Sequence, residues 1–180
     1  MIKINLLNLS QARSAATTFA QGGSQQPFRT QVALFRKSDG SGSSFTRSID
    51  PGGTVQLGEE MMLRIHTRAG DGWNHTRISD VILQRLAPSG EVVNSAILIT
   101  TNGCVNPSMR AVCPAAPVFE PPLGHRLAFR AVMFMGMRSG DEMVMSVRVV
   151  GCLERKDCNV VSEQFHKNFI YIKCNKILMF

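Results

Sequence analysis

The chain has 180 residues, 44% of them hydrophobic, and this size and composition indicate one folded domain with a core rather than a disordered or collagen-like chain. The net charge is +7, but no basic run exceeds two residues, and residues 29–158 hold fifteen Lys and Arg against twelve Asp and Glu, so we expect no nucleic-acid binding. No apolar run reaches the ~18 residues of a membrane helix.

The two ends of the chain differ in composition from its middle. Residues 1–28 are rich in Gln, Ser, Ala and Gly and predict a poorly ordered leader. Polar residues interrupt its apolar stretch, whereas a secretory signal needs about 7 to 15 apolar residues in a row, so we do not identify a signal peptide. Residues 29–158 are predicted to form the folded domain. Residues 159–180, rich in Lys and Asn, are predicted to form an irregular tail, with an extra strand as the alternative.

Within residues 29–158, short apolar runs alternate with turn residues at roughly ten-residue spacing. Residues 31–37 read as the first strand. Residues 61–68 alternate most clearly, and we expect one face of that strand to carry Met61, Leu63, Ile65 and Thr67. Residues 77–87 and 91–101 are joined by the compact turn Pro-Ser-Gly.

Residues 125–137 and 142–152 are joined by Arg-Ser-Gly-Asp and are predicted to form a β-hairpin. No segment has convincing helical periodicity. About seven short strands in this arrangement predict an all-β fold, an immunoglobulin-like antiparallel β-sandwich with two disulfides.

Four of the five cysteines are candidates for those disulfides: Cys104, Cys113, Cys152 and Cys158. Paired ligands of structural zinc are separated by about two to four residues. The residues between these cysteines are more numerous than that. A Cys-x-x-Cys redox pair does not occur. The pattern therefore favours two disulfides and an oxidising compartment, and all three pairings stay open. Cys174 is the odd cysteine.

Methionines gather in two neighbouring segments, and their thioethers could bind copper(I). They occupy alternate positions on the predicted hairpin, a pattern that favours core filling over metal binding: Met133, Met135, Met137, Met143 and Met145. The four histidines are dispersed, and the sequence has no nucleophile motif, phosphate-binding loop or dinucleotide fingerprint. We therefore predict no enzymatic activity, no metal site and no cofactor.

Asn74 begins the tripeptide Asn-His-Thr, an acceptor sequence for N-linked glycans. It follows a Gly-Asp-Gly-Trp stretch that predicts a loop, so Asn74 is a candidate glycosylation site in a secreted protein. Asn8 begins a second acceptor sequence, whereas proline disqualifies the one at Asn106.

The chain from Gln31 to Cys158 resembles the C-terminal half of a zona pellucida module, of the kind found in invertebrate apical-matrix and cuticle proteins. The resemblance rests on the order and spacing of VQLGEEMMLRI, of ISDVILQRL and AILITTNGC, and of LAFRAVMFMG followed by MVMSVRVVGCLERKDC. It implies an immunoglobulin-like sandwich with disulfides. By the resemblance alone, Cys104 would pair with Cys152, and Cys113 with Cys158.

The resemblance further implies a secreted, non-catalytic structural component of a cuticle-like extracellular matrix, involved in filament assembly. Its partners would be other zona pellucida modules or matrix proteins. Because the sequence lacks the family's N-terminal half, dibasic cleavage site and membrane anchor, we expect a fragment of a longer, membrane-anchored precursor at the apical cell surface. Two alternatives stay open: a secreted or cell-surface recognition module that binds a protein partner without polymerising, and an intracellular enzyme or metal protein with reduced cysteines.

Overall fold

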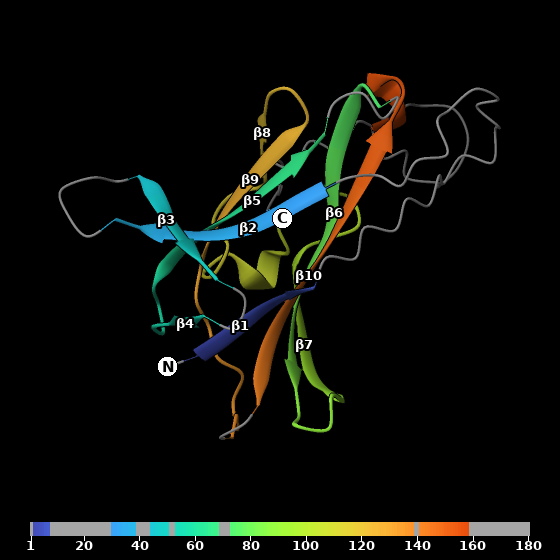
Figure 1. Ribbon diagram of the computed structural model, residues 1–180. Helices are drawn as coiled ribbons and strands as arrows, with labels where there is room; N and C mark the ends of the chain where they lie inside the picture. Colours follow the sequence, from blue (N-terminus) through green and yellow to red (C-terminus); the bar gives the residue numbers. More distant parts are fainter. Residues whose placement is uncertain are drawn as a thin grey trace, which may run out of the picture.

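The computed structural model describes residues 2–7, 30–38, 44–50, 53–68, 73–138 and 141–158. Over these ranges the chain forms ten strands and two short 3-10 helices, and no α-helix. The strands make two five-stranded sheets (Figure 1). The predicted all-β fold class is therefore confirmed.

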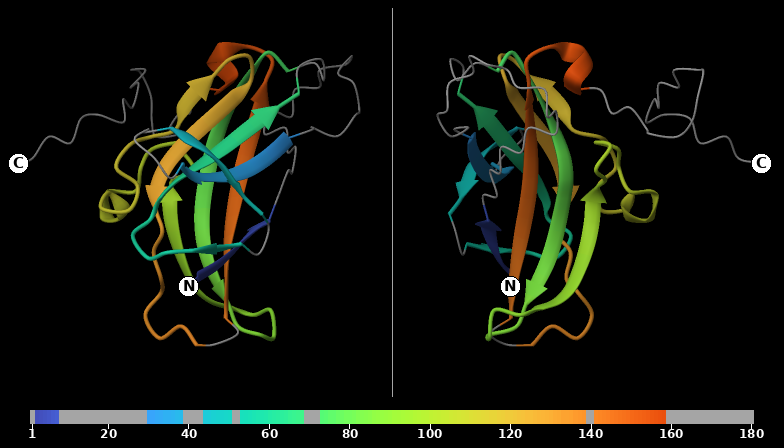
Figure 2. Two further views of the ribbon diagram at one scale, coloured as in Figure 1. Left: turned by 60° about the vertical axis from the view of Figure 1, so that its left-hand side comes forward. Right: turned by 90° about the vertical axis from the view of Figure 1, so that its right-hand side faces the viewer.

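The first sheet has the order β4-β1-β10-β6-β7, formed by Thr54–Val55, Ile2–Leu7, Glu142–Cys152, His75–Leu86 and Val92–Ile99. The second sheet has the order β3-β2-β5-β9-β8, formed by Phe45–Ile49, Thr30–Lys37, Glu60–Thr67, Gly124–Arg130 and Val118–Glu120. Neighbouring strands are antiparallel, except that β1 runs parallel to β10. The two 3-10 helices are η1 (Pro107–Met109) and η2 (Arg155–Cys158). Figure 2 shows η2 and the β6–β7 turn at opposite ends of the fold.

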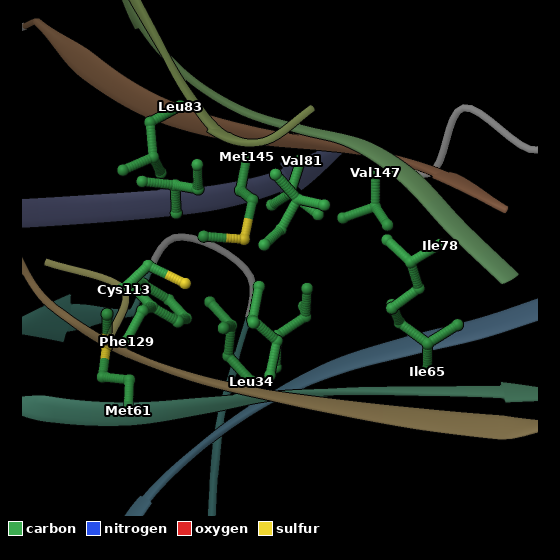
Figure 3. Close-up of a cluster of buried hydrophobic side chains, with 14 of the residues drawn as sticks. Leu34, Met61, Ile65, Ile78, Val81, Leu83, Cys113, Phe129, Met145 and Val147 are labelled. Atoms are coloured by element: carbon green, nitrogen blue, oxygen red, sulfur yellow. The ribbon is translucent and has the colours of Figure 1, made fainter. Parts of the chain in front are cut away.

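The core is built from alternate residues of facing strands. In β5 the fully buried row is the predicted one, Met61, Leu63, Ile65 and Thr67. The corresponding row in β10, from the other sheet, is Met143, Met145, Val147 and Val149. Because successive side chains of a strand point to opposite faces, each sheet contributes one apolar face to a shared cluster (Figure 3).

The chain reverses tightly between β6 and β7. The two strands pair antiparallel, and the backbone N–H of Gly90 donates to the carbonyl of Ala87 at 2.8 Å. Gly90 has a φ of 84°, which a side chain would disfavour. The compact turn predicted here is confirmed.

The hairpin predicted between residues 125–137 and 142–152 is wrong. Strand β9 ends at Arg130 and pairs with β5 and β8 in the second sheet, whereas β10 pairs with β6 in the first. The connecting residues cross between the sheets and turn at Gly136, whose φ is 76°.

The methionine prediction is wrong in part for the same reason. Met143 and Met145 are buried in the core as expected, and Met137 packs against it. Met133 is exposed, and the side chain of Met135 is 95% exposed. The sequence alternation runs on through residues 131–138, although these residues form no strand.

The predicted leader, residues 1–28, contains a strand that sequence analysis missed. Strand β1 lies between β4 and β10, with Ile2 and Lys3 opposite Val55 and Thr54. Its residues Ile4–Leu7 pair with Met143–Ser146 of β10. The rest of the predicted leader, the predicted tail 159–180 and Cys174 lie outside the described residues.

Candidate functional site

One disulfide joins the end of β10 to η2. The Cα atoms of Cys152 and Cys158 are 5.5 Å apart, with a sequence separation of 6 residues. Helix η2 turns the chain back beside the strand end, so the bond closes a short local loop. Both residues are confirmed as disulfide cysteines. Cys104 is disulfide-bonded as well.

Cys113 is a free thiol, so the predicted disulfide at this residue is wrong. Both pairings implied by the family resemblance are therefore wrong. Cys113 is fully buried in the core, in the same cluster as Met61 and Phe129 (Figure 3). Its thiol donates to the carbonyl of Ala115 at 3.5 Å, and burial raises the pKa of the thiol to about 11. The residue acts as a small apolar side chain within the core.

Asn74, the candidate glycan site, is exposed just before β6 and lies next to the disulfide loop. Its backbone N–H donates to the carbonyl of Cys152 at 3.2 Å, and its side-chain Nδ2 donates to the carbonyl of Leu153 at 3.1 Å. An N-linked sugar would leave one hydrogen on Nδ2, so this contact could persist in a glycosylated protein. Glycosylation at Asn74 stays a prediction.

A buried ion pair, which sequence analysis missed, ties the crossing segment to the first sheet. Arg85 of β6 donates to Asp141 from Nε at 2.8 Å and from Nη2 at 2.7 Å, and these side chains are only 9% and 4% exposed. Its Nη1 also donates to Asn94 at 3.2 Å and to the carbonyl of Met135 at 3.4 Å. The backbone N–H of Arg138 and the Arg85 guanidinium lower the pKa of the Asp141 carboxyl. The sequence signal for this ion pair was Arg85 itself, an arginine at a core-facing position in a strand of alternating apolar residues.

Asp80 has an unusual backbone conformation, with a φ of 54° beside an irregular step in the β6–β10 pairing. Its carboxylate accepts the hydroxyl of Thr101 at 2.8 Å and lies 3.2 Å from Nη1 of Arg148. Strained non-glycine residues are candidates for functional sites. Here the carboxylate is engaged by neighbouring side chains, an arrangement that explains the conformation without a ligand.

Strand β7 forms one edge of the first sheet and carries exposed apolar side chains: Val92, Val93 and Ile97. Asn106 covers one end of this edge, where its Nδ2 donates to the carbonyl of Ile97 at 2.9 Å and its backbone N–H donates to the carbonyl of Leu98 at 2.9 Å. Strand β7 contains no charged residue. An uncharged edge strand with exposed apolar side chains is suited to strand addition by another chain.

Among the described residues, no three His, Cys, Asp or Glu side chains gather in a way that could hold a metal ion. In the same ranges, no helix is long and apolar enough to cross a membrane.

No protein-family model matches the chain, and no curated protein sequence matches it.

Proposed function

We propose that this chain is a non-catalytic structural module of the zona pellucida type, which takes part in the assembly of a cuticle-like extracellular matrix. A two-sheet fold closed by a local disulfide supports a protein of an oxidising, extracellular compartment. Its partners would be further copies of the module or other matrix proteins.

The strand order supports an immunoglobulin-like sandwich. In such folds, strands A, B, E and D form one sheet, and strands G, F and C form the other, with C′ added beside C in the variable type. Here β2-β5-β9-β8 corresponds to A-B-E-D, and β10-β6-β7 corresponds to F-C-C′. Along these corresponding strands, the chain changes sheets after β5, β7 and β9, as this Greek-key connection requires. It also changes sheets after β1, β3 and β4, outside this pattern.

The proposal of filament assembly rests on the position of β1. It lies beside β10, in the place that strand G takes in an immunoglobulin-like sheet, but it runs parallel and pairs with only Met143–Ser146 of the 11-residue strand. The edge of a sheet presents backbone donors and acceptors that can pair with any extended segment. A strand from another copy could therefore replace β1, and repeated exchange of this kind would join modules into filaments.

A cross-link tests this route. Leu7 and Ser146 are opposite each other in the β1–β10 register, so the variant Leu7→Cys with Ser146→Cys should lock β1 onto its own sheet. We expect the wild-type chain, exported behind a supplied signal peptide, to self-associate with concentration in analytical ultracentrifugation. The oxidised variant should stay monomeric, and Ser146→Cys alone should behave as wild type. Unchanged assembly of the locked variant would count against strand exchange.

The second candidate is a secreted or cell-surface recognition module that binds a protein partner without polymerising. The exposed edge of β7 favours it, because a partner could add a strand there. A lysine on an edge strand disfavours such pairing. If Val93→Lys abolishes partner binding in a chain that is monomeric at every concentration, the recognition module is the correct reading. If Val93→Lys has no effect and the cross-link blocks assembly, the structural module is correct.

A further inference from the structure

The outer face of the second sheet gathers four cations that are far apart in the sequence. They are Lys37 of β2, Arg64 of β5, and Arg126 and Arg130 of β9, and we call this surface the basic face. Strand register places Arg64 directly opposite Arg126, and Glu60 directly opposite Arg130. The charges are dispersed along the chain but are concentrated on one sheet face.

Two carboxylates lie among these cations, and each is shared by two of them. Glu120 lies 2.8 Å from Nε of Arg64 and 3.9 Å from Nη1 of Arg126. Glu60 contacts Nζ of Lys37 and lies 3.9 Å from Nη2 of Arg130. Four cations against two carboxylates leave the basic face with a net charge of +2.

The arginines of the basic face remain accessible to solvent in the folded chain. The side chains of Arg64, Arg126 and Arg130 are 52%, 53% and 58% exposed, in contrast to the buried Arg85 that anchors the crossing segment. Like charges directly opposite on neighbouring strands destabilise a sheet. Glu120 offsets one of the two charges of the Arg64–Arg126 pair, so one net positive charge remains there for an anionic ligand. Their outward guanidinium groups retain donors for such a ligand.

An apolar strip separates the two charged rows. Phe35, Met62 and Ala128 are register partners across β2, β5 and β9, and they lie between the Arg64–Arg126 row and the Glu60–Arg130 row. Four residues along a strand span about 13 Å, which is the separation of the two rows. The surface therefore offers cations on both sides of an apolar strip.

We propose that the basic face binds a sulfated polysaccharide. Guanidinium groups bind sulfate oxygens through paired, charge-assisted hydrogen bonds, and the apolar faces of sugar rings can pack on the strip. The choice of a polysaccharide over a nucleic acid rests on the extracellular compartment of the proposed function. The binding itself is independent of strand exchange at β10, because the basic face belongs to the other sheet.

The probe is a size-defined heparin oligosaccharide, titrated by calorimetry into protein held monomeric by dilution. We expect Arg64→Gln with Arg126→Gln to weaken binding about tenfold or more. Arg148→Gln is the matched control, since Arg148 is equally exposed and is also paired with a carboxylate, but lies on the other sheet. It should change the affinity by less than about twofold. Glu120→Gln should tighten binding, and a misfolded variant could not produce that gain.

Each of the following would overturn the proposal: no binding by the wild-type chain, equal losses for the double variant and for Arg148→Gln, or weaker binding by Glu120→Gln. A desulfated oligosaccharide should not bind. A single-stranded DNA of matched charge should bind more weakly than heparin, and tighter binding of DNA would assign the basic face to nucleic acid instead. Self-association of the same preparations, measured separately, reports on the proposed module function and not on this site.

Discussion

His125 and Thr76 join the two sheets by a hydrogen bond inside the fold. Nε2 of His125 in β9 lies 3.0 Å from the backbone carbonyl and 3.0 Å from the hydroxyl oxygen of Thr76 in β6. A carbonyl can only accept, so Nε2 carries a hydrogen and donates it. The Thr76 hydroxyl in turn donates to the carbonyl of Leu123 at 3.2 Å. Phe119 covers the ring edge-on, with centroids 5.5 Å apart.

This geometry predicts a pH-dependent stability. Burial lowers the pKa of His125 from its usual 6.5, although the bond to Thr76 opposes the shift. The unfolded chain therefore binds a proton at a higher pH than the folded chain does. The free energy of unfolding should be highest above about pH 7. It should fall as the pH drops through 6.5 towards the lower pKa of His125 in the folded state. Urea unfolding across this window measures it.

The matched control for that experiment is His66→Gln, because His66 is exposed on the outer face of β5. We expect it to keep the wild-type pH profile, whereas His125→Gln should flatten the profile whatever its effect on absolute stability. A flat wild-type profile, or one flattened only by His66→Gln, would contradict the assignment to His125.

Features that depend on near neighbours in the chain could be predicted from the sequence. The buried row of β5 follows from strict alternation, and the β6–β7 turn follows from Pro-Ser-Gly between two apolar runs. Residues 125–137 and 142–152 carry the same local signals, yet their strands belong to different sheets. Alternation indicates which residues of a strand are buried, but it does not indicate which strand pairs with it. Gly136, within the apolar run, allows the chain to turn as it crosses from the second sheet to the first.

The candidate sites could be predicted from the sequence only in part. The disulfide state of Cys152 and Cys158 could be inferred from composition, but the pairing is set by η2, which brings the two residues together. Nothing local distinguishes the buried thiol of Cys113 from a disulfide cysteine. Likewise, the single arginines of β5 and β9 become a shared surface only through strand register.

The buried ion pair between Arg85 and Asp141 predicts unequal effects of two similar substitutions. Asp141→Asn should lower the melting temperature markedly, because it leaves the Arg85 guanidinium buried without its counter-charge. Glu120→Gln, which removes an equally charged partner from the half-exposed Arg64, should change it little. Thermal unfolding followed by circular dichroism compares the two. Equal shifts would show that Arg85 finds enough hydration without Asp141.

The local disulfide should contribute moderately to stability. For a loop as short as the one between Cys152 and Cys158, chain entropy gives about 2 kcal/mol. We expect Cys152→Ala with Cys158→Ala to lower the free energy of unfolding by that amount and to reduce secretion from eukaryotic cells. Non-reducing peptide mapping of the wild-type protein should recover the Cys152–Cys158 peptide. Recovery of a Cys113–Cys158 peptide instead would contradict the structure.

The free thiol of Cys113 should be unreactive in the folded protein. Its side chain is buried, and its pKa of about 11 leaves little thiolate at neutral pH. A maleimide should therefore label Cys113 only after denaturation. Cys113→Ala should cost about 1 kcal/mol, through lost packing, and should leave the disulfide map unchanged. Rapid labelling of native protein at Cys113 would show that the core is open at this position.

The methionines provide the sharpest test of the crossing between β9 and β10. Met145 is fully buried in the core, so Met145→Ala should lower the free energy of unfolding by about 2 to 5 kcal/mol. Met135 occupies an equivalent position in the sequence alternation but is exposed at the turn, so Met135→Ala should change stability by no more than about 0.5 kcal/mol. Chemical denaturation of both variants decides the matter. Similar losses for both would mean that the segment continues β9 as a strand, since only a strand would bury Met135 and Met145 on one core face.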